Sequence, residues 1–118
     1  MLLQHAAILA VTNACLKRGA RFMQSVLIQA ITGRRVIKLL YQNYWRTVEP
    51  HAYGQNKTGN QILRCYQTEV GNASDEIAGW KILHIDEILS FHLMEQRFVV
   101  RQDYEPRDRA MTFIFKQI

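Results

Sequence analysis

Residues 36–49 read VIKLLYQNYWRTVE, and this stretch decides the fold. Ile37, Leu39 and Tyr41 stand at alternate positions, and this period of two is typical of a half-buried β-strand. A similar segment rich in aromatic and β-branched residues follows the polar pair Gln42-Asn43 and ends at Pro50. The stretch therefore predicts a β-hairpin with a tight turn, made of strands over 36–42 and 44–49.

Three more strand-like segments follow this hairpin. They cover residues 61–69, 80–85 and 88–94, and the last of them is either a strand or a short helical turn followed by one. The segments 51–60 and 71–79 are rich in Gly, Asn and other turn residues, so we expect loops there. Five short antiparallel strands of this size usually close, because closure removes exposed edges. We expect a mainly β fold (α+β) built on a small five-stranded antiparallel barrel.

Helical patterns precede the strands. Residues 2–18 have helical composition, and Gly19 is a suitable stop. A second apolar stripe with helical spacing predicts a helix over 23–32, with Gly33 as its left-handed cap. We interpret 1–22 as an extra helix or as an upstream extension from a misplaced start codon. Residues 23–95 then form the barrel, and the apolar segment 96–118 packs on it as a strand or helix.

The charge is divided unevenly along the 118 residues, of which 48% are hydrophobic and 21% charged. The net charge is +5, but residues 1–64 carry +8 and residues 65–118 carry −3. A basic half beside an acidic half favours an anionic partner on one face. The alternative is that the two halves interleave in the fold and their charges cancel.

Cysteine and histidine spacing gives no sign of a cofactor. Cys15 and Cys65 are too few for a disulfide framework, and they lack the spacing of a zinc site. The four histidines show no ligand spacing either, so we expect no metal and no cofactor. The longest apolar run has six residues, where a bilayer span needs about 20. No basic segment precedes that run as in a secretory signal, so we expect a cytoplasmic protein.

Four motifs, in order, resemble a WYL domain. They are Ala30-Ile31 with RRVI over 34–37 and Tyr41, then RTVEP over 46–50, Leu63 with Tyr66, and WKILHIDEI over 80–88. The chain departs from the family at the name-giving triplet, which reads QIL over 61–63, and it has Lys81 where the family has Arg. No helix-turn-helix precedes the motifs, so the chain resembles a diverged, free-standing member.

The resemblance implies a fold and a function. WYL domains are small Sm-like or SH3-like barrels, which usually follow a DNA-binding domain in bacterial regulators. They are thought to sense nucleic-acid or nucleotide ligands. The resemblance therefore implies a ligand-sensing regulatory module in bacterial transcription regulation or defence.

Cations and aromatic residues on consecutive predicted strands form the candidate binding site. Arg46, Arg64 and Lys81 stand on three such strands, and Tyr66 shares a face with Arg64. Guanidinium groups bind phosphate bidentately, and aromatic rings stack on bases. With Tyr41 and Tyr53, these residues predict a site for single-stranded nucleic acid or a nucleotide. The alternative is that the aromatic residues form core and the arginines pair with acids.

We find no signature of catalysis. The sequence has no GxSxG, P-loop or GxGxxG motif. Asp86 and Glu87 would point to opposite faces of a strand. Cys65 with His51 or His84 could be a nucleophile and base, but a buried structural cysteine is the simpler interpretation. We expect no enzyme. An alternative to ligand binding is a protein-interaction module that forms a homodimer or docks on a partner regulator.

Overall fold

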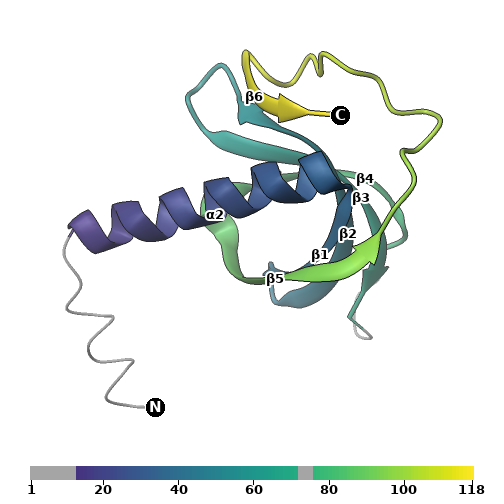
Figure 1. The fold of residues 1–118 in the computed structure, drawn as a ribbon, viewed down its shortest axis with the longest axis horizontal. Helices are drawn as coiled ribbons and strands as arrows, with labels where there is room; N and C mark the ends of the chain where they lie inside the picture. The colour runs from purple at the N-terminus through teal and green to yellow at the C-terminus, as the bar shows by residue number, and fades with distance from the viewer. Residues whose placement is uncertain (1–12, 72–75) are drawn as a thin grey trace.

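The computed structural model describes residues 13–71 and 76–118, with side chains from residue 21 onward (Figure 1). One helix is followed by six strands and one 3-10 turn. They are α2 (Asn13–Gly33), β1 (Arg35–Tyr41), β2 (Tyr44–Gln55), β3 (Gln61–Val70), β4 (Gly79–His84), η1 (Ile85–Glu87), β5 (Ile88–Arg97) and β6 (Phe113–Gln117). The expected mainly β fold with an N-terminal helix is confirmed. The residues of the first expected helix that precede Asn13 lie outside the described residues.

The strands form one antiparallel sheet in the order β4-β3-β2-β1-β5, and β6 pairs with β2 outside this path. Figure 1 shows this sheet curving around one interior, with α2 lying along it. The core joins Leu27, Ala30 and Ile31 of α2 to buried side chains of the strands, including Ile37 and Leu63. Among the described residues β4 and β5 do not pair, so the expected closed five-stranded barrel is not confirmed.

The predicted hairpin is confirmed. Tyr41 pairs with Tyr44, and the two residues between them, Gln42 and Asn43, have φ values of 48° and 70°. Positive φ at both central positions is the type I′ geometry, whose twist matches that of the flanking strands. The alternation is confirmed as well, because Ile37, Leu39 and Tyr41 are buried.

The prediction that the second strand ends at Pro50 is wrong. β2 continues to Gln55, and Pro50 pairs with Cys65 of β3. On its other side, β2 pairs with β1 as far as Val48 and with β6 from Ala52 onward. Pro50 lies in the gap between these two partners, where its missing N–H interrupts neither ladder.

The helix also differs from the prediction at both of its glycines. α2 continues through Gly19 and across the expected boundary after residue 22. At its C-terminus the left-handed residue is Arg34, with φ 52°, rather than Gly33. Arg97 caps this end of the helix from outside, because its Nη1 donates a hydrogen bond to the carbonyl of Gly33 at 2.6 Å.

The C-terminal segment pairs with and covers the sheet. β6 runs antiparallel to the second half of β2. Between β5 and β6, residues 98–112 cross the sheet, burying Phe98 and Met111. Residues 88–94 lie entirely in β5, so the strand alternative for this segment is confirmed; the 3-10 turn η1 precedes it, at Ile85–Glu87. The expected 71–79 loop is described at residue 71 and from residue 76 onward. In the described ranges, no helical segment has the length and hydropathy needed to cross a bilayer.

Candidate functional site

Arg46 is the centre of a buried polar cluster on the inner face of the sheet. Its residue is 2% exposed. Its Nε donates to the carbonyl of Tyr41 at 3.0 Å, and its Nη1 donates to Oε1 of Gln67 at 3.0 Å and forms an ion pair with Glu76. Nζ of Lys81 lies 3.8 Å from the other oxygen of the Glu76 carboxylate. We call Tyr41, Arg46, Gln67, Glu76 and Lys81 the Arg46 cluster.

Gln67 gives this cluster an unused donor. The side chain is fully buried. Its Oε1 accepts from Arg46, which fixes the orientation of the amide, and its Nε2 has no hydrogen-bond partner. An unpaired buried donor costs about 1–3 kcal/mol. Gln67 was not among the predicted site residues. It stands at alternate positions with Leu63 and Cys65, which are buried, and a glutamine on that strand face was the signal that could have identified it.

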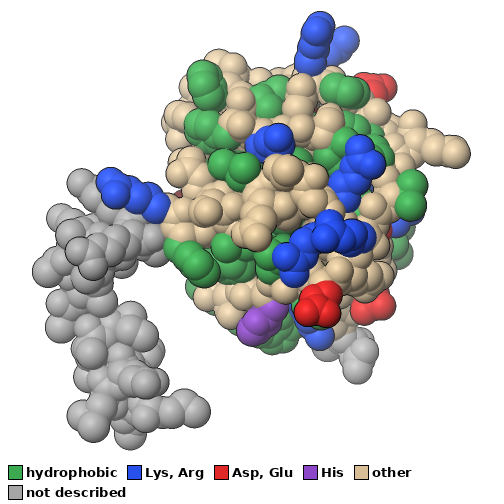
Figure 2. Space-filling model, viewed as in Figure 1, with side chains coloured by type: hydrophobic (Ala, Val, Ile, Leu, Met, Phe, Trp, Pro, Cys, Tyr) green, Lys and Arg blue, Asp and Glu red, His purple; other side chains and the backbone are tan. Residues whose placement is uncertain are grey.

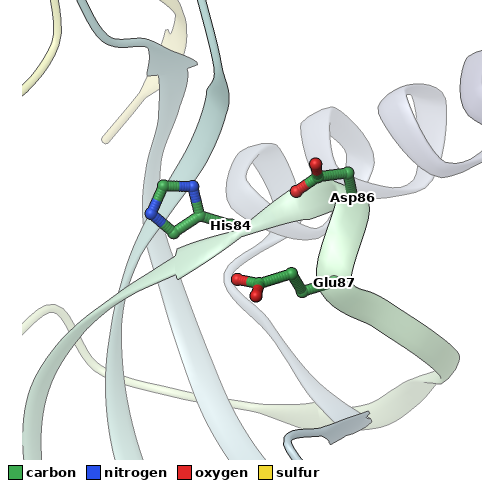
Figure 3. A group of neighbouring side chains, drawn as sticks. All are labelled: His84, Asp86 and Glu87. Atoms are coloured by element: carbon green, nitrogen blue, oxygen red, sulfur yellow. The ribbon is translucent and has the colours of Figure 1, made fainter.

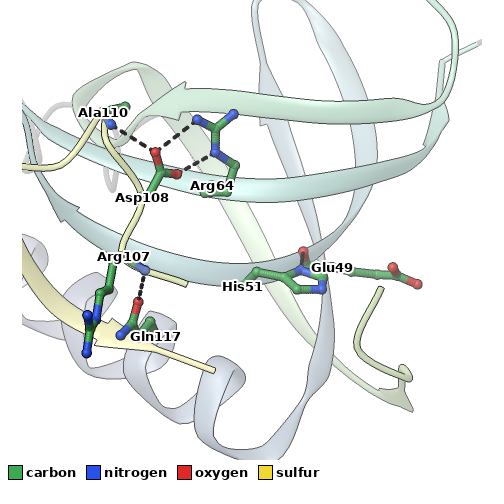
Figure 4. Close-up of polar contacts among 7 residues, drawn as sticks. All are labelled: Glu49, His51, Arg64, Arg107, Asp108, Ala110 and Gln117. Carbon is green, nitrogen blue, oxygen red and sulfur yellow. Dashed lines mark hydrogen bonds and ion pairs between the residues drawn. The ribbon is translucent and has the colours of Figure 1, made fainter. Parts of the chain in front are cut away.

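Arg64 belongs to a different surface, on the outer face of the sheet. Its Nε and Nη2 donate to the carboxylate of Asp108 at 2.5 and 3.1 Å (Figure 4). Asp108 also accepts from the backbone N–H of Ala110 at 2.9 Å. The guanidinium is the main cause that holds the pKa of Asp108 below its usual value. The Nε and Nη2 donors of Arg64 are therefore both used in a bidentate ion pair that links the 98–112 segment to β3.

Tyr66 shares the outer face but contacts another cation. The guanidinium carbon of Arg101 lies 3.7 Å from the centre of its ring, a cation–π contact. Nε of Arg101 also donates to the carboxylate of Glu49 at 2.8 Å. Tyr53 is fully buried in the core, where its hydroxyl donates to Gln61 at 2.5 Å.

The six predicted site residues therefore separate into three places. Tyr41, Arg46 and Lys81 meet on the inner face, Arg64 and Tyr66 lie on the outer face, and Tyr53 is core. Strand register is the reason. Lys81 pairs with Cys65, whose side chain is buried in the core, whereas Arg64 pairs with Ile82. Paired residues share a face, so Arg64 and Lys81 point to opposite sides.

His51 lies on the outer face among aromatic rings. Its ring centroid is 4.8 Å from that of Trp80, 5.1 Å from Phe98 and 5.0 Å from Tyr104. Its Nδ1 is 2.8 Å from the carbonyl oxygen of Glu49, and burial lowers its pKa. A pocket of about 580 Å³ opens beside this group, lined by Arg64, Trp80 and residues 103–109. Acids and arginines both line it, so it has no single sign of charge.

Cys65 is fully buried in the core, and burial raises the pKa of its thiol to about 12. The thiolate that a nucleophile requires is therefore scarce at neutral pH. The imidazole of His51 lies against the outer face, so the sheet separates it from this thiol.

A cluster of metal-ligand type lies beside η1. One donor atom from each of His84, Asp86 and Glu87 lies within 4.8 Å of the others. Figure 3 shows the two carboxylates directed to the same side as the His84 ring. The prediction that Asp86 and Glu87 point apart is wrong, because they stand in a 3-10 turn and not in a strand. No ligand spacing in the sequence had identified this group.

The charges of the two halves of the chain largely interleave. Three ion pairs join the basic half to the acidic half: Arg46 with Glu76, Arg64 with Asp108, and Arg101 with Glu49. Figure 2 shows Lys and Arg side chains spread over the viewed face rather than gathered into one patch. This arrangement favours the alternative in which the charge asymmetry of the sequence cancels in the fold.

Comparison of the chain with protein-family models, with curated proteins and with solved structures finds no match.

Proposed function

We propose that this protein is a ligand-sensing module that binds an anionic group at the Arg46 cluster, where the carboxylate of Glu76 holds the place of the ligand. The observation that carries the proposal is the unpaired Nε2 of buried Gln67 beside the buried guanidinium of Arg46. A phosphate offers several acceptor oxygens. It could bind Arg46 as Glu76 does and also satisfy the Gln67 donor.

Glu76 is suited to exchange with a ligand. Its side chain is 37% exposed, whereas that of Arg46 is 3% exposed, so the carboxylate reaches a buried cation from the solvent side. The same carboxylate lies near the ammonium of Lys81. An incoming anion would therefore meet two cations already arranged around one negative group.

The depth of Arg46 favours a terminal phosphate over the internal phosphates of a strand. An internal phosphodiester carries chain on both sides, whereas a terminal phosphate carries chain on one side and can approach a guanidinium whose side chain is 3% exposed. We propose a nucleotide or the 5′-phosphate end of a single-stranded oligonucleotide as the ligand. The resemblance to WYL domains supports the same ligand class and a regulatory role. It also supports a cytoplasmic location and an Sm-like or SH3-like origin of the curved sheet.

The experiment compares a 5′-phosphorylated oligothymidylate with its 5′-hydroxyl form by fluorescence anisotropy. We expect the phosphorylated form to bind more tightly, and Glu76→Gln to raise its affinity about tenfold, or ~1.4 kcal/mol. Glu76 is exposed, so this variant should fold. Glu95→Gln, which removes an exposed acid on β5, is the matched control and should leave the affinity unchanged.

Two outcomes would overturn this function. One is equal affinity for the two oligonucleotides. The other is an absence of binding by both the wild type and Glu76→Gln, with mononucleotides also failing as competitors. Lys81→Ala should weaken the binding of the phosphorylated form and leave the fold intact, because the Lys81 side chain is 29% exposed.

Exposed apolar side chains favour a second candidate function, self-association. A groove of about 630 Å³ between α2 and β5 is lined by Phe22, Met23, Leu89, Phe91 and Leu93 among others. Phe22 is 65% and Leu89 73% exposed. Such exposure in a contiguous apolar groove is typical of an interface. Light scattering should then show a dimer that Phe22→Ser and Leu89→Ser convert to monomer, and a monomeric wild type would contradict this candidate.

A further inference from the structure

The His84, Asp86 and Glu87 side chains combine a nitrogen donor with two carboxylates at one place. His84 ends β4, and the chain turns immediately through η1, which brings both acids back beside the imidazole (Figure 3). All three side chains are exposed or half-buried, so their rotamers can adjust. One imidazole nitrogen with two carboxylate oxygens is a donor set suited to a divalent transition ion.

Within the part of the chain that the structure describes, neither carboxylate has a cationic ion-pair partner. Among the described residues, the ion pairs involve Glu49, Glu76 and Asp108, and none includes Asp86 or Glu87. Two carboxylates therefore lie beside one another and beside an imidazole ring. A bound cation would supply the missing positive charge.

A buried hydroxyl outside the cluster holds the ligand-bearing residues in place. Tyr41 is nearly fully buried. Its hydroxyl donates to Oε2 of Glu87 at 3.0 Å and accepts from the backbone N–H of His84 at 3.2 Å. Hydrogen bonds of this kind orient the ligands of metal centres. One buried tyrosine thus fixes both ends of the His84–Glu87 turn relative to β1.

We propose that His84, Asp86 and Glu87 form a binding site for one divalent transition ion of the zinc type. Metal–donor bonds of 2.0–2.2 Å place neighbouring donors about 3.4 Å apart. The donor atoms of the three side chains now lie within 4.8 Å of one another, and rotation of the exposed carboxylates brings them to that separation. Three protein ligands leave a coordination position for water or an exogenous ligand, whereas a closed structural zinc site has four protein ligands.

The experiment titrates the tag-free full chain with Co²⁺ and follows its visible absorption, and a calorimetric titration with Zn²⁺ gives the stoichiometry. We expect one ion per chain. His84→Gln and Glu87→Gln should each weaken binding at least tenfold, and Tyr41→Phe, which removes only the orienting hydroxyl, should weaken it by about tenfold. His92→Gln removes an exposed imidazole on β5 and is the matched control that should change nothing.

The site is refuted if neither titration detects binding, or if His84→Gln binds both ions as tightly as the wild type. Loss of binding in His92→Gln would also refute it, because the ion would then lie elsewhere. Circular dichroism of each variant separates lost binding from lost folding. The site does not involve Arg46 or Glu76, so the oligonucleotide experiment can fail while this one succeeds.

Discussion

Asp108 accepts two hydrogen bonds from Arg64, at 2.5 and 3.1 Å, and this pair ties the 98–112 segment to the outer face of β3 (Figure 4). The Asp108 side chain is 9% exposed and that of Arg64 26% exposed. The pair is therefore only partly screened by solvent, and its loss should be measurable.

Asp108→Asn should lower the free energy of unfolding by about 1–3 kcal/mol at pH 7. The pKa of Asp108 is lowered in the folded protein, mainly by Arg64, from an ordinary value of 3.8. The stabilisation is therefore fully present above pH 3.8 and is lost as the pH falls through the folded value. Urea denaturation of both proteins should show their difference shrinking in acid, and a constant difference would contradict this prediction.

Gly54→Ala should detach β6 from β2. An added Cβ would meet the backbone oxygen of Phe113 and lie 2.7 Å from Sδ of Met111. Such a clash costs about 1–3 kcal/mol. Gly71→Ala is the control, because the nearest atom to its added Cβ is 3.5 Å away. Thermal unfolding should separate the two variants, and equal stabilities would contradict the close approach of β6.

Arg34→Gly should stabilise the protein. Arg34 has φ 52° at the end of α2. The left-handed conformation costs a non-glycine residue about 1–2 kcal/mol, and glycine avoids this cost. Part of the gain is offset because glycine loses more conformational entropy on folding. We expect a gain of about 0.5–1 kcal/mol in urea denaturation. Arg34→Ala keeps the unfavourable conformation and should show no gain. Equal changes in the free energy of unfolding for the two substitutions would mean that loss of the Arg34 side chain, and not the positive φ, causes the change.

His51 should make stability fall as the pH drops below neutral. Burial is the largest cause that lowers the pKa of His51 from 6.5. Of the charged groups that face the ring, Glu49 and Asp103 raise this pKa and Arg101 lowers it. Between pH 6.5 and the lowered value, the unfolded chain binds the proton and the folded chain does not. Stability is therefore unaffected by this group above pH 6.5 and declines below it.

The measurement is the free energy of unfolding between pH 7.5 and 5, compared with that of His51→Gln. The variant should lose part of the slope, whatever its absolute stability. His92→Gln, which changes an exposed histidine, should keep the wild-type slope. Parallel slopes for all three proteins would show that His51 titrates normally.

Local features of the fold were predictable from the sequence. The β1–β2 hairpin depends on residues that are close in sequence, and the alternation of Ile37, Leu39 and Tyr41 identified its buried face. The full length of β2 was not predictable from the sequence. Proline is tolerated at position 50 because the pairing with β1 has ended at Val48 and the pairing with β6 begins only at Ala52. That condition depends on β6, about 60 residues later.

The candidate site was predictable only within single strands. The sequence placed Arg64 on the same strand face as Tyr66, and the alternating burial of β3, with both residues half-buried, agrees with this. It could not show that Lys81 pairs with Cys65, because register between strands depends on distant contacts. A one-residue slip would have brought Arg64 and Lys81 to the same face. The cluster of His84, Asp86 and Glu87 was not predicted, because the sequence did not show that Asp86 and Glu87 stand in a 3-10 turn rather than in a strand.

The pairing of β6 with the second half of β2 joins residues 52–55 to residues 113–117 across a long intervening chain. Closing so large a loop costs more entropy than forming the local hairpins, so we expect this pairing to form late during folding. It should also open first, giving the amides of that half of β2 the fastest hydrogen exchange in the central strand. When it opens, β2 presents a bare backbone edge to which an extended peptide could add as a strand.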